Sequence, residues 1–340
     1  MIRSRHNENT HPLATPALQD RFGRRIDYLR LSLTDRCDLR CSYCRPKNFD
    51  GYAEPENWLT FNEILRVVGA FTRMGVARVR LTGGEPLLRR DLVNLVADLA
   101  ALPGLDDLSL STNATQLAKH AVALKQAGLA RINVSLDSLD RNCMREVSGR
   151  DSLDAIMTGI MAGKAAGLTP IKLNMVAMRG VNEHEIERMA SFCLENGFIL
   201  RLIEAMPIGE NGRNTHYLSL DEVRPRLVER FGLQPTCVEL GGGPARYWET
   251  ADGSGRIGFI TPISQHFCAT CNRVRLSVEG TLYLCLGQEE RVELRPLLRA
   301  GITDTELETV LREAIELKPE NHEFIDAPGK IMRFMSQTGG

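Results

Sequence analysis

The sequence lacks the long apolar runs by which membrane-spanning and secreted proteins are recognised. No stretch of about 18 apolar residues occurs, so no part of the chain is predicted to cross a membrane. The opening segment, MIRSRHNENTHPLATPALQDR, also lacks the apolar core of a signal peptide. We therefore expect a cytoplasmic protein with no membrane partner and a disordered leader at residues 1–20.

The sequence also has no excess of positive charge and few aromatic side chains. The 340 residues carry a net charge of −1, and only 6% of them are aromatic. A protein that binds RNA typically has an external basic patch and aromatic rings for base stacking. We therefore expect no nucleic-acid partner, and any anionic ligand must be held by a local cluster of cations.

Cysteine is plentiful, but each cysteine group lacks a fourth member. The nine cysteines include two groups of three, which are Cys37, Cys41 and Cys44, and Cys268, Cys271 and Cys285. A structural zinc site normally has four protein ligands, and a [4Fe–4S] cluster usually has four cysteines. No histidine lies between His11 and His120, although His266 lies two residues before Cys268. A zinc site completed by a distant residue, or by His266 in the second group, is one interpretation. The other is a cluster with one iron open to a ligand.

Strand-like and helix-like segments alternate along residues 26–206. Strands are predicted at 26–35, 78–84, 107–113, 131–138, 170–178 and 199–206. Helices are predicted near 60–74, 91–101, 115–128, 154–167 and 183–196. Capping boxes mark helix starts at Thr60 with Glu63 and at Ser219 with Glu222. This alternation is typical of a parallel α/β sheet. Near residue 235 the pattern changes, which predicts a core domain at 21–235 and a C-terminal domain at 236–340.

Each predicted strand has one polar face and one apolar face, because side chains alternate along a strand. The polar face carries Arg30, Ser32, Thr34, Arg78, Arg80, Thr82, Ser109, Ser111, Asn113, Asn133, Ser135, Asp137, Lys172 and Asn174. The helices must cover the apolar face, so the polar face is expected to line a channel, with Arg201 as a further cation. An incomplete barrel of six βα units follows, with an open doubly wound sheet as the alternative. Unpaired buried cations are costly, so the channel predicts an anionic occupant.

Two motifs resemble the signatures of the radical S-adenosylmethionine superfamily. One is Cys37-x3-Cys41-x2-Cys44 with Tyr43 before the last cysteine, and the other is LTGGEP at 81–86. The resemblance implies a partial (β/α)6 barrel and a cluster whose open iron binds S-adenosylmethionine, which is then cleaved to a 5′-deoxyadenosyl radical. In LTGGEP, Gly83 and Gly84 allow close backbone approach, and Glu85 offers an anion for an ammonium group.

The second cysteine group narrows this resemblance to one family. Cys268-x2-Cys271-x13-Cys285, the segment FCATCNRVRLS and the final Gly-Gly resemble the GTP 3′,8-cyclase family of molybdenum cofactor biosynthesis. The resemblance implies a lyase with two [4Fe–4S] clusters, the second with an open iron that binds guanine. Hydrogen abstraction from ribose C3′ of GTP and attack on C8 would give (8S)-3′,8-cyclo-7,8-dihydroguanosine 5′-triphosphate. Implied partners are a cytosolic one-electron donor and cyclic pyranopterin monophosphate synthase, which receives the product; a homodimer is left open.

The same resemblance implies roles for individual residues. The first cluster is held by Cys37, Cys41 and Cys44, and the second by Cys268, Cys271 and Cys285. S-adenosylmethionine is contacted by Tyr43, Gly84, Ser135 and Met206. GTP is contacted by Arg30, Arg78, Arg80, Ser111, Lys172, Arg201, Arg273, Val274 and Arg275. Gly339 and Gly340 are implied to be catalytic, in a tail that enters the active site and assists radical initiation; a frayed tail is the alternative.

Two residues depart from the family pattern, and two other functions compete with it. Ala114 stands where the family has glycine, and Arg45 stands where an uncharged residue is expected. A radical enzyme that modifies a peptide would usually have more C-terminal cysteines than three. A zinc or iron–sulfur module that binds RNA would place its cations outside the barrel. Cations on the inner strand faces therefore favour the cyclase.

Overall fold

All six predicted strands form one parallel sheet at the centre of the molecule. The structure is a computed structural model that describes residues 17–44, 49, 52–209, 216–238, 240–327, 330–331 and 333–339. The strands are β1 (Tyr28–Ser32), β2 (Arg78–Thr82), β3 (Asp107–Thr112), β4 (Arg131–Ser135), β5 (Lys172–Ala177) and β6 (Ile199–Glu204). Consecutive strands are parallel neighbours throughout. The alternation of the sequence therefore predicted both the strands and their order.

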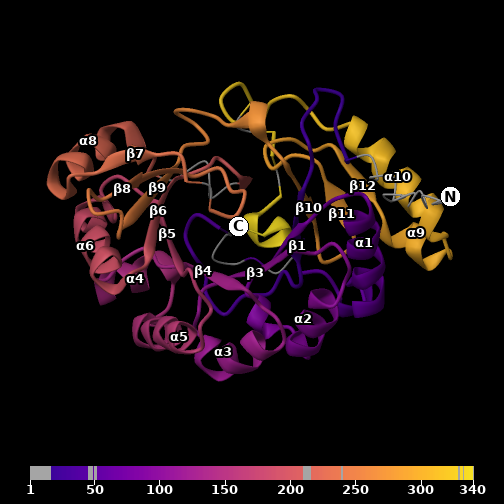
Figure 1. Cartoon of the computed structure of the whole chain (residues 1–340), viewed down its shortest axis with the longest axis horizontal. Coiled ribbons are helices and arrows are strands. Elements are labelled where there is room, and N and C mark those ends of the chain that lie inside the picture. The colour runs from indigo at the N-terminus through magenta and orange to yellow at the C-terminus, as the bar shows by residue number, and fades with distance from the viewer. Residues whose placement is uncertain are drawn as a thin grey trace, which may run out of the picture.

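The helices between the strands cover the outside of the sheet (Figure 1). They are α1 (Phe61–Arg73), α2 (Leu92–Ala100), α3 (Leu117–Gln126), α4 (Arg141–Ser148), α5 (Leu153–Ala165) and α6 (Ile186–Asn196). Short 3-10 turns are η1 (Pro55–Asn57), η2 (Pro86–Leu88), η3 (Glu183–Glu185) and η4 (Cys268–Thr270). Only α4 was not predicted. Across the part of the chain that the structure describes, no helix has the length and apolar character needed to cross a membrane.

The two predicted capping boxes have different outcomes. At α1 the hydroxyl of Thr60 accepts from the backbone N–H of Glu63, whose carboxylate accepts from the N–H of Thr60, as predicted. Helix α8 (Leu220–Phe231) is also capped by a hydroxyl, but Ser219 accepts from the N–H of Asp221. The carboxylate of Glu222 instead binds Arg179 at 2.8 Å. A longer-range ion pair therefore replaces the second half of that capping box.

Strands from the C-terminal part of the chain extend the sheet at both ends. β9 (Arg256–Ile260) pairs in parallel with β6, and β10 (Arg273–Leu276) pairs in parallel with β1. Antiparallel strands follow on each side, namely β8 (Arg246–Glu249) and β7 (Gln234–Thr236), and β11 (Thr281–Tyr283) and β12 (Arg291–Glu293). The resulting twelve-stranded sheet is curved but does not close, which confirms a partial barrel with a C-terminal module. The domain boundary near residue 235 stays a prediction.

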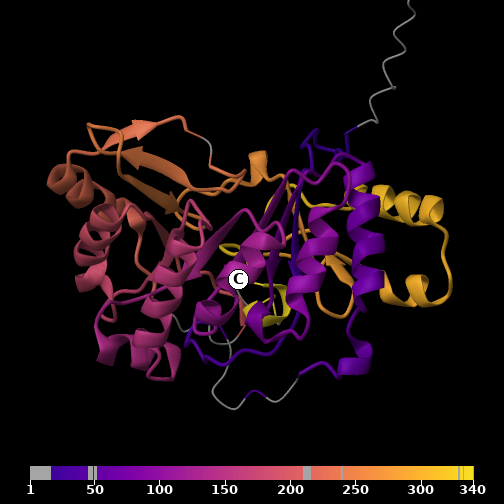
Figure 2. The same cartoon turned by 60° about the horizontal axis from the view of Figure 1, so that its bottom comes forward.

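The inner face of the sheet is polar, as the alternation predicted. Leu29, Leu31 and Leu33 are fully buried in the apolar core beneath the helices, whereas Arg30 and Arg80 belong to the opposite face. Three further helices come from the C-terminal part, namely α9 (Arg295–Arg299), α10 (Asp304–Glu316) and α11 (Met335–Thr338). Helices α9 and α10 lie outside the sheet, beside β12, whereas α11 lies inside its curve (Figures 1 and 2). The last described helix of the chain therefore lies inside the barrel.

Candidate active site

Arginine side chains from four strands line one cavity in the barrel interior. Arg30 on β1 lies in register between Arg80 on β2 and Arg275 on β10. Arg273 on β10 and Arg201 on β6 line the same cavity. The described residues that line it include no aspartate and no glutamate. We call it the cationic cavity; its wall is suited to an anion with several negative charges.

Burial and mutual repulsion lower the pKa values of the arginines in this wall. Burial lowers the pKa of Arg80 to about 10, and the same effect, with repulsion from Arg273, lowers that of Arg275 to about 10. Burial and the charge of Arg275 place the pKa of Arg30 well below its ordinary value. Arginine with a pKa near 10 stays protonated at neutral pH. A bound anion would therefore relieve repulsion that the fold maintains in its absence.

Neutral partners orient these arginines without cancelling their charge. Arg201 donates to the side-chain oxygens of Asn174 at 2.8 Å and Asn133 at 2.7 Å. The guanidinium of Arg80 lies 5.3 Å from the ring centre of Tyr28, and that of Arg273 lies 5.9 Å from it. Sequence reasoning placed both asparagines on the polar face but gave them no role. It missed Tyr28, although Tyr28 has the same strand parity as Arg30.

Other predicted GTP contacts are divided between this cavity and its surroundings. Ser111 and Val274 line the cationic cavity. Arg78 forms an ion pair with Asp27 and lines a neighbouring cavity, which shares Arg273 with the cationic cavity. Lys172 is fully buried and donates to the carbonyl oxygen of Leu240 at 2.8 Å. Lys172 and Arg78 therefore lie outside the described lining of the cationic cavity.

The first cysteine group occupies the loop after β1. The sulfur of Cys37 accepts from the N–H of Leu39 at 3.4 Å and from the side-chain amide of Asn113 at 3.7 Å. The N–H of Cys44 donates to the carbonyl of Cys41 at 2.9 Å, which makes a tight turn. Burial, with repulsion from Glu85, raises the pKa of Cys37 to about 12. A bound metal is the partner that makes a thiolate favourable in such a setting.

Gly83 and Gly84 bring their backbone close to that loop. An added side chain at Gly84 would lie 2.2 Å from the carbonyl oxygen of Arg36, and one at Gly83 would lie 2.4 Å from that of Thr34. Only glycine permits this contact, which sets the position of the strand against the cysteine loop. The close backbone approach predicted for Gly83 and Gly84 is therefore present, and the segment that they approach is the cysteine loop.

The role expected for Glu85 is wrong. Its carboxylate accepts from the hydroxyl of Thr112 and the N–H of Asn113, both at 2.7 Å, and it is fully buried. Burial raises its pKa to about 7. The ends of β2 and β3 are adjacent, so this glutamate joins them and does not line either interior cavity. It therefore does not offer its charge to a ligand's ammonium group.

Three of the predicted S-adenosylmethionine contacts meet in a second interior cavity. Tyr43, Ser135 and Met206 line it together, and Gly84 does not. The hydroxyl of Tyr43 donates to Asp137 at 2.8 Å, and burial raises the pKa of Asp137 to about 6. Residues that line both cavities, including Ser111, Asn174, Ile203, Met206 and Met335, show that the two are adjacent.

The second cysteine group lines the cationic cavity itself. Cys268, Cys271 and Cys285 all face it, from η4 and from the segment after β11. Each sulfur accepts a backbone N–H: Cys268 from His322, Cys271 from Arg273 and Cys285 from Gly287. His266 lines the neighbouring cavity instead and packs against the ring of His322, with 5.8 Å between ring centres. The zinc site completed by His266 therefore lacks support.

The donor chemistry of both groups fits iron–sulfur ligation. Thiolates with N–H groups directed at sulfur are typical of such sites. Within the described ranges, no three His, Cys, Asp or Glu side chains are gathered around a position for a single metal ion. Thiolates on one zinc lie roughly 3.8 Å apart, given Zn–S bonds of ~2.3 Å in a tetrahedron. Thiolates on a four-iron cluster bind different irons and stand further apart, so both groups remain compatible with a cluster.

The last described residues lie inside the barrel. Arg275 donates to the carbonyl oxygens of Thr338 and Gly339. Gly339 has a φ of 76°, and an added side chain there would lie 2.2 Å from the methyl carbon of Thr82. A residue with a side chain would therefore displace this segment. Gly340 and Arg45 lie outside the described residues.

Comparisons with known proteins agree with this geometry. The model of the Radical SAM superfamily matches residues 31–193, and that of Molybdenum Cofactor Synthesis C matches residues 198–324. Streptococcus suis SuiB bound to its precursor peptide SuiA has a TM-score of 0.59 at 17% identity, covering 84% of this chain and 66% of SuiB. At that identity the likeness shows the fold alone. The fold and the first cysteine loop thus define a radical S-adenosylmethionine protein.

Curated relatives identify the family more closely. The GTP 3′,8-cyclase of Erythrobacter litoralis is 48% identical over 335 residues, covering 96% of this chain and 100% of the relative. Those of Pseudomonas savastanoi and Paracoccus denitrificans are 45% and 43% identical, covering 96% and 95% of this chain and 100% and 96% of the relatives. The chain belongs to the GTP 3′,8-cyclase family.

Proposed function

We propose that this protein converts GTP to (8S)-3′,8-cyclo-7,8-dihydroguanosine 5′-triphosphate, the first step of molybdenum cofactor biosynthesis. The observation that carries the proposal is the cationic cavity, where five arginines and the second cysteine group share one wall. A triphosphate carries about four negative charges at neutral pH and forms charge-assisted hydrogen bonds with guanidinium groups. GTP therefore has the charge that this cavity lacks.

The arginines bind and orient the triphosphate. Arg30, Arg80 and Arg275 present three adjacent guanidinium groups across parallel strands. Arg201 is fixed by its two asparagines and approaches from β6. Arg78, which is paired with Asp27, and Lys172 lie beside the cationic cavity, and Lys172 gains its positive charge when the triphosphate binds. This arrangement holds the ribose and base in one orientation and limits the water that reaches them.

The two cysteine groups divide the chemistry between them. A radical S-adenosylmethionine protein contains S-adenosylmethionine and one [4Fe–4S] cluster, which Cys37, Cys41 and Cys44 would hold. When bound, they supply the 5′-deoxyadenosyl radical that removes hydrogen from ribose C3′. We assign a second [4Fe–4S] cluster, with an open position for guanine, to Cys268, Cys271 and Cys285, because they face the cavity of the arginines.

The remaining roles extend the same proposal. Tyr43, Ser135 and Met206 contact S-adenosylmethionine, and Gly84 supports that site through the cysteine loop. Gly339 and Gly340 assist radical initiation, which fits the position of Gly339 beside Arg275. A cytosolic one-electron donor supplies the electron, and cyclic pyranopterin monophosphate synthase receives the product.

Anaerobic reconstitution tests this function. Purified protein treated with iron and sulfide should take up about eight irons, as two four-iron clusters require. Addition of GTP, S-adenosylmethionine and a reductant should then give 5′-deoxyadenosine and the cyclic nucleotide. Arg273→Ala and Arg275→Ala should weaken GTP use and leave the first cluster intact. Absence of 5′-deoxyadenosine, or normal cyclisation by both variants, would contradict the proposal.

A further inference from the structure

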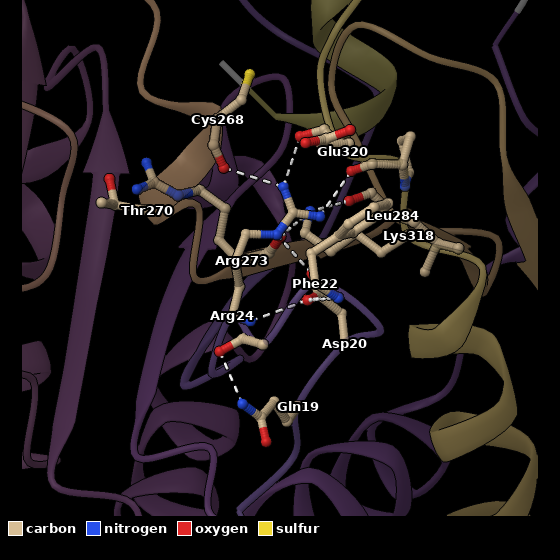
Figure 3. Close-up of polar contacts among 12 residues, drawn as sticks. Gln19, Asp20, Phe22, Arg24, Cys268, Thr270, Arg273, Leu284, Lys318 and Glu320 are labelled. Atoms are coloured by element: carbon tan, nitrogen blue, oxygen red, sulfur yellow. Dashed lines mark hydrogen bonds and ion pairs between the residues drawn. The ribbon is translucent and has the colours of Figure 1, made fainter.

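Three buried cations bind the backbone around the second cysteine group. They are Arg24 before β1, Lys318 after α10 and Arg333 before α11, and each donates to carbonyl oxygens of the cysteine segments. Arg24 and Arg333 also form ion pairs, with Asp20 at 2.6 Å and with Glu289 at 2.7 Å, but most hydrogen bonds of the three side chains go to backbone carbonyls. Figure 3 shows Arg24 and Lys318 among these carbonyls.

Arg24 joins the segment of Cys268 to the turn after α10. Its guanidinium donates to the carbonyl of Cys268 at 3.0 Å and to those of Pro319 and Glu320, both at 2.7 Å. An ion pair with Asp20 at 2.6 Å fixes it. The turn that it holds leads to His322, whose N–H donates to the sulfur of Cys268. Arg24 thus fixes both the cysteine and the segment that supplies its hydrogen bond.

Lys318 fixes the segment that follows Cys271. It is 1% exposed, and its ammonium group donates to the carbonyl of Arg273 at 3.1 Å and to that of Leu284. The N–H of Arg273 donates to the sulfur of Cys271, while Leu284 directly precedes Cys285. Among the described residues no carboxylate forms an ion pair with Lys318, although lysine is rarely fully buried without one. Its charge is thus directed at this backbone.

Arg333 completes the set at Cys285. One guanidinium nitrogen donates to the carbonyls of Cys285 at 3.0 Å, Leu286 at 2.5 Å and Gln288 at 2.8 Å. Between these residues lies Gly287, whose N–H donates to the sulfur of Cys285. Each of the three cysteines therefore has one cation that fixes the segment from which its sulfur receives an N–H.

We infer that Arg24, Lys318 and Arg333 are positioning residues for the second iron–sulfur cluster, an inference that rests on the proposed function. The three cations come from parts of the chain outside residues 268–288, and they hold the cysteine segments at fixed spacing before iron binds. The charges of Arg24 and Arg333 are paired with Asp20 and Glu289, so Lys318 is the cation that offsets the negative charge of the thiolate-rich site. Residues in this position typically change metal affinity by about 10–100-fold when they are replaced.

A variant with a single cluster site isolates the effect. With Cys37→Ser, Cys41→Ser and Cys44→Ser combined, only the second group can bind iron, and this background should take up about four irons per chain. Lys318→Met in that background should release iron to a chelator about tenfold faster or more. Its reduced cluster should also give an altered electron paramagnetic resonance spectrum. Lys164→Met is the matched control, because exposed Lys164 donates to the carbonyl of Asn196 far from this site.

The possible results distinguish a failure of the positioning role from a failure of the proposed function. If Lys318→Met keeps the release rate and spectrum of the background, the positioning role is wrong. If the background takes up no iron, the second cluster of the proposed function is wrong, and this inference with it. Circular dichroism checks folding. If Lys318→Met does not fold, Arg24→Gln and Arg333→Gln test the positioning role in its place. Both should release iron faster while keeping the native circular dichroism spectrum.

Discussion

Lys172 carries the clearest proton-linked property at the scale of single residues. Burial, together with repulsion from Arg201, Arg131 and Arg80, lowers its pKa to about 6. Lysine is therefore mostly neutral here at pH 8, where the terminal phosphate of GTP is fully ionised. A triphosphate nearby favours the charged form and raises this pKa, so GTP binding should take up a proton.

Calorimetry measures that proton. Titrations of GTP at pH 8 in buffers of different ionisation enthalpy should show uptake approaching one proton per GTP, and Lys172→Met should abolish it. Equal uptake by the wild type and Lys172→Met would show that this lysine stays neutral, or that another group takes the proton.

Gly84 yields a second prediction at this scale. Gly84→Ala forces a methyl group against the carbonyl of Arg36, so the cysteine loop or β2 must shift. We expect a loss of about 1–3 kcal/mol in the free energy of unfolding, as for other overpacked sites, and weaker S-adenosylmethionine binding. Urea unfolding and equilibrium binding measure the two effects. Gly69→Ala is a useful comparison, because Gly69 lies in α1 without a positive φ and its added carbon would meet only the end of the Arg73 side chain, at 3.4 Å. Unchanged stability in Gly84→Ala would contradict the close contact.

Individual site residues differ in how far the sequence predicted them. Arg30, Arg80 and Ser111 follow from strand parity, because a period of two places them on the face that the helices cannot cover. Glu85 was assigned wrongly, since a motif gives the order of residues but not the direction in which a side chain points. Nothing in the sequence indicated a role for Lys318, because its hydrogen-bond partners lie 34 and 45 residues away in sequence.

At the scale of elements, the turn between β3 and α3 combines backbone strain with favourable packing. Ala114 has a φ of 63°, in the left-handed region that glycine adopts without strain. Its methyl group is fully buried, beside Gly159 of α5. Ala114 therefore adopts a strained backbone conformation at a position where the family has glycine, and burial of its methyl group offsets part of that strain.

Substitutions at Ala114 should separate strain from packing. Ala114→Gly relieves roughly 1 kcal/mol of strain but loses a methyl worth ~0.8 kcal/mol of burial, so stability should change by less than about 1 kcal/mol. Ala114→Val adds a branched side chain at positive φ beside Gly159 and should destabilise by more than ~2 kcal/mol. Thermal unfolding of both variants checks this. Similar melting temperatures for the valine variant and the wild type would contradict the left-handed turn.

Regular elements were predicted well where a pattern repeats and poorly where it does not. The six strands and five of the helices follow from periodicity and capping signals. Helix α4 is only Arg141–Ser148, and such a short segment offers little periodicity. Strands β9 and β10 were not recognised as parallel neighbours of β6 and β1, because their pairing joins segments up to 245 residues apart.

At the scale of the whole molecule, the C-terminal part completes the sheet that the core begins. Without β9 and β10, the edges of β6 and β1 would expose unpaired backbone groups, a common cause of aggregation. A fragment that ends at residue 235 should therefore unfold without cooperativity and bind hydrophobic dyes, whereas the full chain should unfold cooperatively. Circular dichroism melts and dye fluorescence measure this. A cooperative melt of the fragment would show that residues 21–235 form an independent domain.

The central claim is that GTP lies in the cationic cavity with its ribose C3′ facing the S-adenosylmethionine site. The adjacent cavities, with Ser111 and Met206 in both walls, are the structural basis of that claim. Turnover of GTP deuterated at C3′ tests it most directly, by mass spectrometry of the 5′-deoxyadenosine formed. Deuterium in 5′-deoxyadenosine and its loss from the cyclic nucleotide are the predicted result. Unlabelled 5′-deoxyadenosine formed from fully labelled GTP would contradict the account.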